Sequence, residues 1–137
     1  SDHAGLELKR TLAGELARRG LEVRDFGTHT SDSCDYPDFA HAVAQALERG
    51  EIEQALLVCG TGVGMSIAVN RHRAARAVVC SEPFSARMAR QHNDANVLCL
   101  GARVLGAGTA LDVLDAFLGA AFEGGRHAGR VAKIEPA

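Results

Sequence analysis

Short apolar runs alternate with longer segments of helical periodicity along most of this chain of 137 residues. The runs at 55–58, 77–79 and 97–100 contain no polar alternation, which is typical of strands buried on both faces of a sheet. Segments long enough for a helix of about 10 to 15 residues separate them, and this arrangement indicates βαβ units around a parallel sheet. We therefore predict an α/β fold.

Apolar residues spaced four apart predict the helices on either side of this sheet. The first helix has a stripe of Leu8, Leu12 and Leu16 and is expected to end at Gly20. The second has Phe39, Val43 and Leu47 and is closed by Gly50. Thr109 is expected to cap the last long helix, whose apolar face is Leu111, Leu114 and Leu118.

Residues 21–26 form a further strand candidate, but no strand precedes the first helix in the sequence. A parallel sheet of this kind normally begins with a strand. We predict a mostly parallel sheet of about five strands whose first strand is missing from residues 1–137. The sequence has no internal repeat, low-complexity stretch or linker, so we expect one domain over residues 1–137.

Composition excludes several classes of protein. The net charge of -2 gives no reason to expect a nucleic-acid partner. No apolar run approaches the roughly 18 residues of a membrane span, and residues 1–5 lack the apolar core of a signal peptide. Of the four cysteines, three lie in or at the end of apolar runs and none forms a CxxC pair. This pattern favours free thiols in a reducing compartment, without a structural metal, and we expect a cytoplasmic protein.

A cysteine followed by glycines at alternate positions gives the strongest chemical signal. A buried strand ends at Cys59, and Gly60, Gly62 and Gly64 follow it. Glycines let a ligand approach the backbone closely, and the N–H groups of the next helix stabilise an anion or a thiolate there. A thiolate beside such donors is suited to removing a proton from carbon while the donors hold an enediolate oxygen. On spacing alone, the loop fits equally well a buried cysteine followed by a tight turn.

This loop does not match three better-known motifs. A Walker loop requires Gly-Lys-Ser/Thr, whereas this chain has Gly64-Met65-Ser66. A C-x5-R phosphatase loop requires arginine at the position of Met65. The glycine spacing is G-x-G-x-G and not the G-x-G-x-x-G of a dinucleotide site. These departures argue against an ATPase, a tyrosine phosphatase and an NAD enzyme.

Other candidates lie outside the loop. His92 can exchange a proton near neutral pH, although a lone histidine is more often part of a polar helix end. Arg126 and Arg130 are four apart and can grip a phosphate from one helix face, although a solvated basic tail fits them equally. The further candidates are Asp2 and His3 at the start of the chain, and Arg103 after the last apolar run.

Taken together, these segments resemble the ribose-5-phosphate isomerase B family, which includes the allose- and galactose-6-phosphate isomerases. The resemblance lies in seven segments in the family's order: 1–5, 35–37, 59–66, 76–83, 91–96, 101–103 and 123–130. It implies a Rossmann-like three-layer α/β/α fold, a homodimer or a tetramer of such dimers, and aldose–ketose isomerisation of a sugar phosphate without metal or cofactor.

The resemblance also implies roles for individual residues. Cys59 would move the proton between C1 and C2, supported by the hydroxyl of Thr61, because Met65 stands where one branch of the family has a glutamate base. His92 would help to open the furanose ring. The remaining residues would bind substrate: the backbone of Gly60, Gly62, Val63 and Gly64 the enediolate, Asp2 the ring oxygen or its hydroxyls, Asn93 the hydroxyls or the developing anion, and His3, Arg103, Arg126 and Arg130 the phosphate. The site would be shared between two subunits.

Three hypotheses for the function follow. The first is an isomerase acting on ribose 5-phosphate and ribulose 5-phosphate. The second is an isomerase that prefers a six-carbon phosphate such as allose 6-phosphate, which differs by the room needed at the phosphate end. The third is a sugar-phosphate-binding module without catalysis. Cys59, Thr61 and His92 argue against the third, because a binder needs neither a base nor a ring-opening acid.

Overall fold

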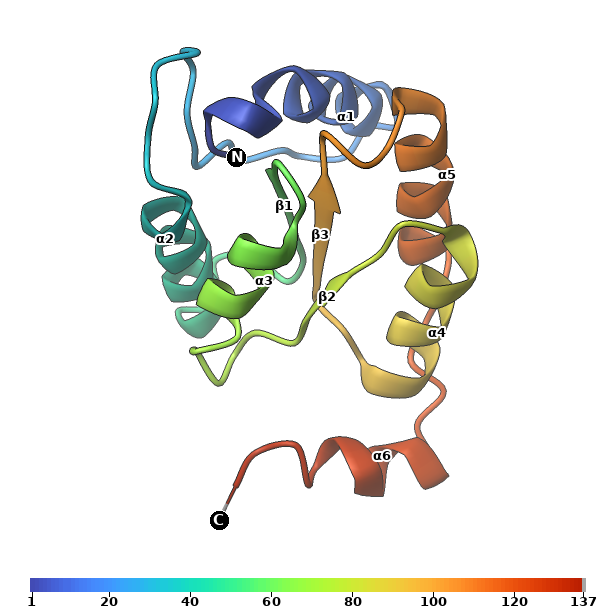
Figure 1. Ribbon diagram of the computed structural model, residues 1–137. Coiled ribbons are helices and arrows are strands. Elements are labelled where there is room, and N and C mark those ends of the chain that lie inside the picture. Colours follow the sequence, from blue (N-terminus) through green and yellow to red (C-terminus); the bar gives the residue numbers. More distant parts are fainter. Residues whose placement is uncertain (137) are drawn as a thin grey trace.

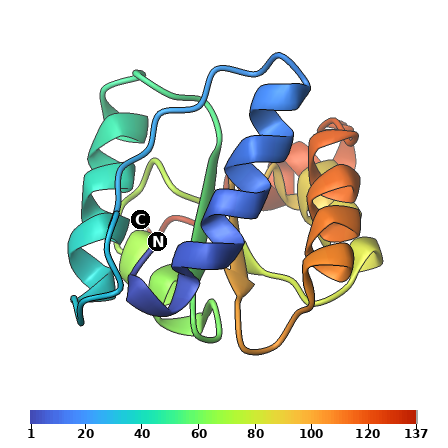
Figure 2. The same ribbon diagram turned by 90° about the horizontal axis from the view of Figure 1, so that it is seen from above.

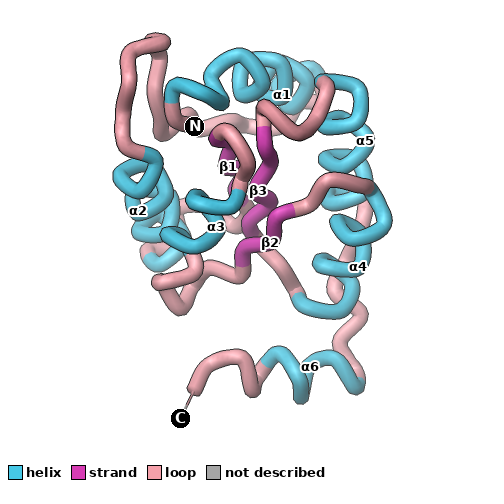
Figure 3. The backbone as a smooth tube through the Cα atoms, in the orientation of Figure 1, coloured by secondary structure: helices cyan, strands magenta, loops and turns pink. Residues whose placement is uncertain are grey.

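The computed structural model describes residues 1–136, which form a three-stranded parallel sheet between layers of helices (Figures 1 and 3). The strands stand in the order β1-β3-β2, with Cys59 opposite Gly101 at the carboxyl ends of β1 and β3. The strands are β1 (Ala55–Cys59), β2 (Ala77–Val79) and β3 (Val97–Gly101). The helices are the 3-10 turn η1 (His3–Gly5), α1 (Leu6–Arg18), α2 (Tyr36–Glu48), α3 (Val63–Val69), α4 (Pro83–Asn93), α5 (Ala107–Leu118) and α6 (Arg126–Val131).

Side chains of the strands alternate between two separate cores. Leu57 and Cys59 of β1 pack in one core against α2 and α3, whereas Val58 packs in the other against α1 and α5. Figures 1 and 2 show α2 on one side of the sheet and α5 on the other. Both faces of the central strands are therefore covered, which explains why their sequences are continuously apolar. The predicted three-layer α/β/α fold is confirmed.

The number of strands differs from the prediction. Three strands are present within residues 1–136 and not about five, and residues 21–26 are not a strand. A strand needs a neighbour for its backbone hydrogen bonds. Residues 21–26 have none, because a groove separates them from β1, which is an edge strand of the sheet.

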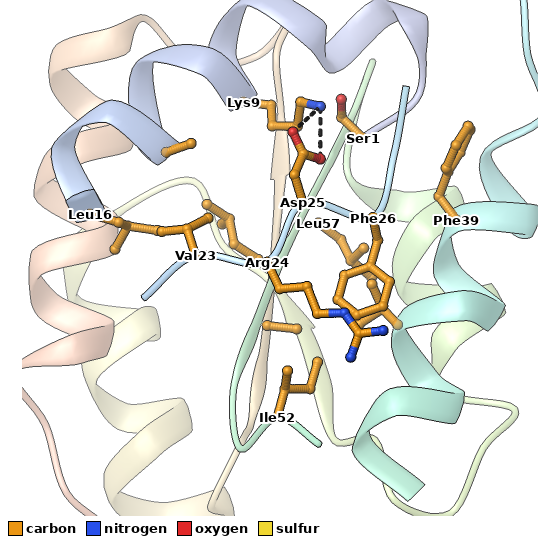
Figure 4. A pocket seen from close by; sticks show the side chains of 14 residues that line it. Ser1, Lys9, Leu16, Val23, Arg24, Asp25, Phe26, Phe39, Ile52 and Leu57 are labelled. Atoms are coloured by element: carbon orange, nitrogen blue, oxygen red, sulfur yellow. Dashed lines mark hydrogen bonds and ion pairs between the residues drawn. The ribbon is translucent and has the colours of Figure 1, made fainter. Parts of the chain in front are cut away.

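This groove is lined mainly by apolar side chains from both of its walls, including Val23, Phe26 and Leu57 (Figure 4). One wall of the groove is formed by residues 23–26, called the outer wall below. Lys9 of α1 holds this wall in place, because its ammonium group donates to the Asp25 carboxylate at 2.8 and 2.9 Å and to the Thr28 carbonyl oxygen at 2.7 Å.

The first residues of the chain close one end of the groove. The N–H of Asp2 donates to the Val58 carbonyl oxygen at 3.3 Å, and the Ser1 carbonyl oxygen accepts from the N–H of Thr28 at 2.9 Å. Ser1 and Asp2 thus bond to β1 on one side and to the outer wall on the other. These bonds fix η1, which follows at once, beside the carboxyl end of β1.

Most helix ends agree with the sequence signals. Gly20 and Gly50 follow α1 and α2 with φ of 76° and 66°, left-handed values that favour glycine. The predicted cap at Thr109 is wrong, because α5 begins at Ala107 after the extended residue Gly106. Among the described residues, none of the helices has the length and apolar character needed to cross a membrane.

Candidate active site

Cys59 lies at the carboxyl end of β1, where the chain turns towards α3. Its side chain is buried with Met65 and Cys99 beneath the loop that follows, and only 5% of the residue is exposed. The N–H of Gly62 donates to Cys59 Sγ at 3.1 Å. A backbone N–H of the loop therefore points directly at the sulfur atom. The structure thus places the sulfur of Cys59 beneath the glycine loop, within hydrogen-bond distance of its backbone.

The glycine loop, residues 59–64, turns sharply between β1 and α3. Gly62 adopts a left-handed φ of 79°, and a Cβ there would lie 3.0 Å from the backbone of Leu100. Thr61 is exposed at the tip, and its Oγ1 accepts from the N–H of Val63 at 3.3 Å. A Cβ on Gly64 would lie 2.7 Å from the ring of Tyr36. The loop thus presents the Thr61 hydroxyl and backbone donors on a surface beside the ring of Tyr36.

The end of β3 supports this loop from below. Ala102 and Arg103 donate their N–H groups to the carbonyl oxygens of Cys59 and Gly60 at 2.8 and 3.0 Å. The Arg103 side chain lies against Gly60, where an added Cβ would be 3.4 Å from Nη1. A guanidinium group therefore stands beside the loop, as an anion contact requires.

Replacing Gly101 with alanine is expected to disturb the loop and lower stability. A Cβ at Gly101 would lie 2.8 Å from backbone atoms of Thr61, which have no rotamer by which to move away. Overpacking of this kind costs about 1–3 kcal/mol of unfolding free energy. Urea denaturation measures the loss, with Gly106→Ala as control, because an added Cβ there meets nothing within 4 Å. Equal stabilities of the two variants would contradict the expected crowding at Gly101.

Asp2 and His3 lie at the same edge of the sheet as Cys59. Asp2 is 6% exposed, and its Oδ1 accepts from the N–H of Gly5 at 3.1 Å, which caps η1. His3 is half-buried, and its Nδ1 accepts from the N–H of Cys34 at 3.2 Å. This bond leaves the Nε2 nitrogen of His3 as the one carrying the ring proton, which suits it to donate to an anion.

A second group of candidates lies around the end of α4. His92 is in its last turn, and its ring stacks on that of His127 with centroids 4.2 Å apart and planes 8° apart. Asn93 is exposed at the end of the helix. Arg76 and Arg90 fix the turn that follows, because both bind the Asp94 carboxylate, at 2.8 and 3.1 Å.

His127 is buried in α6, although its neighbours in that helix face solvent. Burial lowers the pKa of His127, and the charge of nearby His92 lowers this pKa further, so its imidazole is neutral at neutral pH. Arg126 and Arg130 are both exposed. Their spacing on a helix confirms the expectation that they share a face.

The structure separates the predicted site residues into two groups at opposite edges of the sheet. Cys59 stands at the carboxyl edge, with the other loop residues, Asp2, His3 and Arg103. His92 and Asn93 end α4, which leads into the first residue of β3 and hence lies at the amino edge. Helix α6 contacts α4 at this edge (Figure 1). Within one chain, His92, Asn93, Arg126 and Arg130 are therefore not brought together with Cys59.

The remaining thiols lie in environments that differ from that of Cys59. Burial raises the pKa of Cys80 to about 11, and burial also raises the pKa of Cys99 well above its usual range. Both thiols are therefore protonated at neutral pH. Cys34 is half-buried beside His3 and contacts its ring nitrogen at 3.8 Å. Cys34, Cys80 and Cys99 are all interpreted from the sequence as packing residues; Cys80 and Cys99 lie in the cores, whereas Cys34 lies outside both.

Sequence reasoning missed three residues at the site. Tyr36 was seen only as part of a matching segment, although its ring covers Gly64. Glu123 and His127 were not singled out, although Glu123 Oε2 lies 4.0 Å from Nε2 of His92 and 3.7 Å from that of His127. The sequence does contain a sign of this pair. His127 lies between Arg126 and Arg130, and on a helix its side chain points away from the face that the two arginines share.

A glycine loop at the carboxyl edge of a parallel sheet is typical of the small-ligand site of an α/β domain. The family profile described as Ribose/Galactose Isomerase matches residues 1–134. Ribose-5-phosphate isomerase B of Escherichia coli K12 is 53% identical over 133 residues, which are 97% of this chain and 89% of that protein. The chain therefore belongs to the ribose/galactose isomerase family, the family of ribose-5-phosphate isomerase B.

Solved structures agree with this assignment. Ribose-5-phosphate isomerase B of Clostridium thermocellum is 54% identical, with a TM-score of 0.95 over 97% of this chain and 90% of that one. The enzyme of Mycoplasma genitalium with bound ribulose-5-phosphate is 40% identical, with a TM-score of 0.92 over 97% of this chain and 89% of that one. The resemblance inferred from the seven motif segments is thereby confirmed.

Proposed function

We propose that this chain is an aldose–ketose isomerase that interconverts D-ribose 5-phosphate and D-ribulose 5-phosphate. The observation that carries the proposal is the bond from the Gly62 N–H to Cys59 Sγ at the start of the glycine loop. The relatives add the substrate, because several are named for ribose 5-phosphate and one structure holds ribulose-5-phosphate.

In the proposed reaction, the Cys59 thiolate removes the proton from C2 of the open-chain aldose and returns it to C1. The electron pair left at C2 forms the C1–C2 double bond of the enediolate, and the negative charge passes to O1, which accepts from backbone N–H groups of the glycine loop. The proton on O2 moves to O1, and C2 becomes the carbonyl carbon as C1 takes up the returned proton. The hydroxyl of Thr61 donates a hydrogen bond beside the sulfur. The conversion moves protons without a change in redox state, and the proposed mechanism assigns no step to a cofactor.

The proposal gives the remaining candidates to binding and ring opening. His92 transfers a proton to the ring oxygen, and Asp2 and Asn93 hold the sugar hydroxyls. His3, Arg103, Arg126 and Arg130 bind the phosphate. We propose that two chains share each site, so that α4 and α6 of one chain face the glycine loop of its partner. The separation of the two groups within one chain supports a homodimer, or a dimer of dimers.

We also propose that residues 1–137 are a single domain and that the protein acts in the cytoplasm. The family profile supports the first point, since its match runs without a break over residues 1–134. The second point is supported by four cysteines that are all free, as in a reducing compartment.

The test is ribulose 5-phosphate formation from ribose 5-phosphate, with a chelator present and with deuterium exchange at C2 as second readout. Turnover with solvent exchange supports the isomerase. Substrate binding without exchange would instead support the binding module. Parallel assays with allose 6-phosphate decide between the five-carbon and the six-carbon substrate. A higher kcat/KM for the six-carbon sugar would contradict ribose 5-phosphate as the substrate.

Replacing Arg126 with alanine is expected to raise KM about 10- to 100-fold and to change kcat less. The variant would lose a charge-assisted hydrogen bond to the phosphate, which contributes about 1.5–3 kcal/mol to the free energy of binding. Steady-state kinetics measure it, with Arg18→Ala as control, because Arg18 is an exposed arginine on α1. An unchanged KM would show that Arg126 does not contact the phosphate.

A further inference from the structure

Two imidazoles and one carboxylate converge near the end of α4. The ligand atoms of His92, Glu123 and His127 all lie within 4.8 Å of one another. Glu123 Oε2 is 4.0 Å from His92 Nε2 and 3.7 Å from His127 Nε2. Both rings thus turn the same nitrogen towards one carboxylate.

The backbone brings these residues together from two separate segments. The N–H of Glu123 donates to the Gln91 carbonyl oxygen at 3.0 Å, which ties the segment before α6 to the last turn of α4. Gly124 and Gly125 then turn the chain with left-handed φ of 64° and 53°. The first turn of α6 follows, and His127 enters it buried against the ring of His92. Glu123 and His127 are therefore held beside His92 by main-chain geometry.

We propose that His92, Glu123 and His127 bind a divalent ion of the zinc class. Two histidines and one carboxylate, with a fourth position left to water, are a ligand set that zinc accepts. Ligand atoms about 2.0–2.1 Å from a tetrahedral ion lie about 3.3 Å apart, so the side chains must draw together by about 1 Å. The two rings lie 8° from parallel, so the His92 ring must also rotate out of the stack for both Nε2 lone pairs to point at one ion. The His92 and Glu123 side chains are 38% and 51% exposed and can make this movement, whereas His127 is a buried anchor.

The bound ion has a consequence that rests on the proposed function. Coordination occupies the lone pair on His92 Nε2, so this nitrogen can neither accept a proton nor pass one to the ring oxygen. The ion therefore inhibits turnover of the cyclic sugar and is not a cofactor. Removing it with a chelator restores activity, because coordination breaks no covalent bond.

Zinc binding to the assembled protein, measured by calorimetry without substrate, tests the site directly. Glu123→Gln and His127→Phe are each expected to weaken binding at least tenfold. The phenylalanine keeps a ring stacked on His92, and the glutamine is a substitution at an exposed position, so the pair guards against a folding defect. His41→Phe is the matched control, because His41 belongs to another histidine pair, with its Nδ1 2.8 Å from His72 Nε2. This control is expected to bind zinc as the native chain does.

Cysteine is a competing zinc ligand, and Cys59→Ala separates the two explanations. The proposal expects Cys59→Ala to keep zinc binding and His127→Phe to lose it. Loss in Cys59→Ala with retention in His127→Phe would overturn the site, as would equal binding by all variants or none by the native chain. The calorimetry measures zinc binding without turnover. Its result can therefore be interpreted even if the protein proves not to be an isomerase. Co²⁺ absorption gives a second readout, since a tetrahedral site produces intense visible bands.

Discussion

The Cys59→Ala variant is expected to lose about 10²- to 10⁴-fold in kcat for isomerisation, the usual contribution of a general base. The reason is local, because the sulfur that accepts from the Gly62 N–H is removed while the loop keeps its backbone bonds to Ala102 and Arg103. Substrate affinity and fold are expected to remain, since the proposed phosphate contacts lie elsewhere. Steady-state kinetics with ribose 5-phosphate and deuterium exchange at C2 measure the loss.

Cys80→Ala is the matched control for this experiment. Cys80 is also a buried thiol that follows a strand, but burial raises its pKa to about 11 and it lies outside the glycine loop. Its removal is expected to leave kcat within a few-fold of native. Equal turnover by the native chain and Cys59→Ala would show that another group takes the proton. Turnover lost along with the circular dichroism of the fold would show only that Cys59 is needed for packing.

Two inactive variants are expected to restore activity when they are combined. Cys59→Ala and His92→Ala each damage every site of their own homodimers. A mixed dimer with a site shared between chains contains one site built from an intact Cys59 and an intact His92. Random pairing makes half of the dimers mixed, so co-expression at equal levels is expected to recover about a quarter of native activity.

Co-expression of Cys59→Ala with Thr61→Ala is the control, because both changes lie in the glycine loop and no pairing yields a complete site. Its activity is expected to stay at the average of the two parents. A Cys59→Ala and His92→Ala mixture that also stays at that average would contradict a shared site. Size-exclusion chromatography of the same samples verifies that the chains have paired.

The sequence predicted the fold well wherever a pattern had one physical cause. Continuous apolar runs became strands because both faces of the sheet are covered, and Gly20 and Gly50 ended helices because both adopt left-handed φ. The strand predicted at residues 21–26 is absent because strand formation depends on a neighbouring strand, which composition cannot reveal. Thr109 does not cap α5, because the cap position is Gly106, three residues earlier, which makes no side-chain hydrogen bond.

The sequence proposes candidate site residues one by one, but it does not show how they are arranged in space. The glycine spacing after Cys59 pointed to the loop, and the structure adds the bond from Gly62 to the sulfur. That His92 lies at the opposite edge from Cys59 follows from the direction of α4 relative to β3, which only the fold specifies. The stacking of His127 on His92 was hidden because the two are far apart in sequence and meet only when α6 packs against α4.

The proposed division of the site between the two edges of the sheet would restrict how a pair of chains can be arranged. In the proposed shared site, each carboxyl edge meets the amino edge of its partner. Two chains satisfy this demand at both sites only when they lie side by side with opposite strand directions, related by a twofold axis perpendicular to the strands. Stacking the chains end to end with parallel directions would complete one site and leave an unfilled half-site at each end, from which growth would continue as a filament. Point-group closure is therefore a condition that the proposed shared site sets on the assembly.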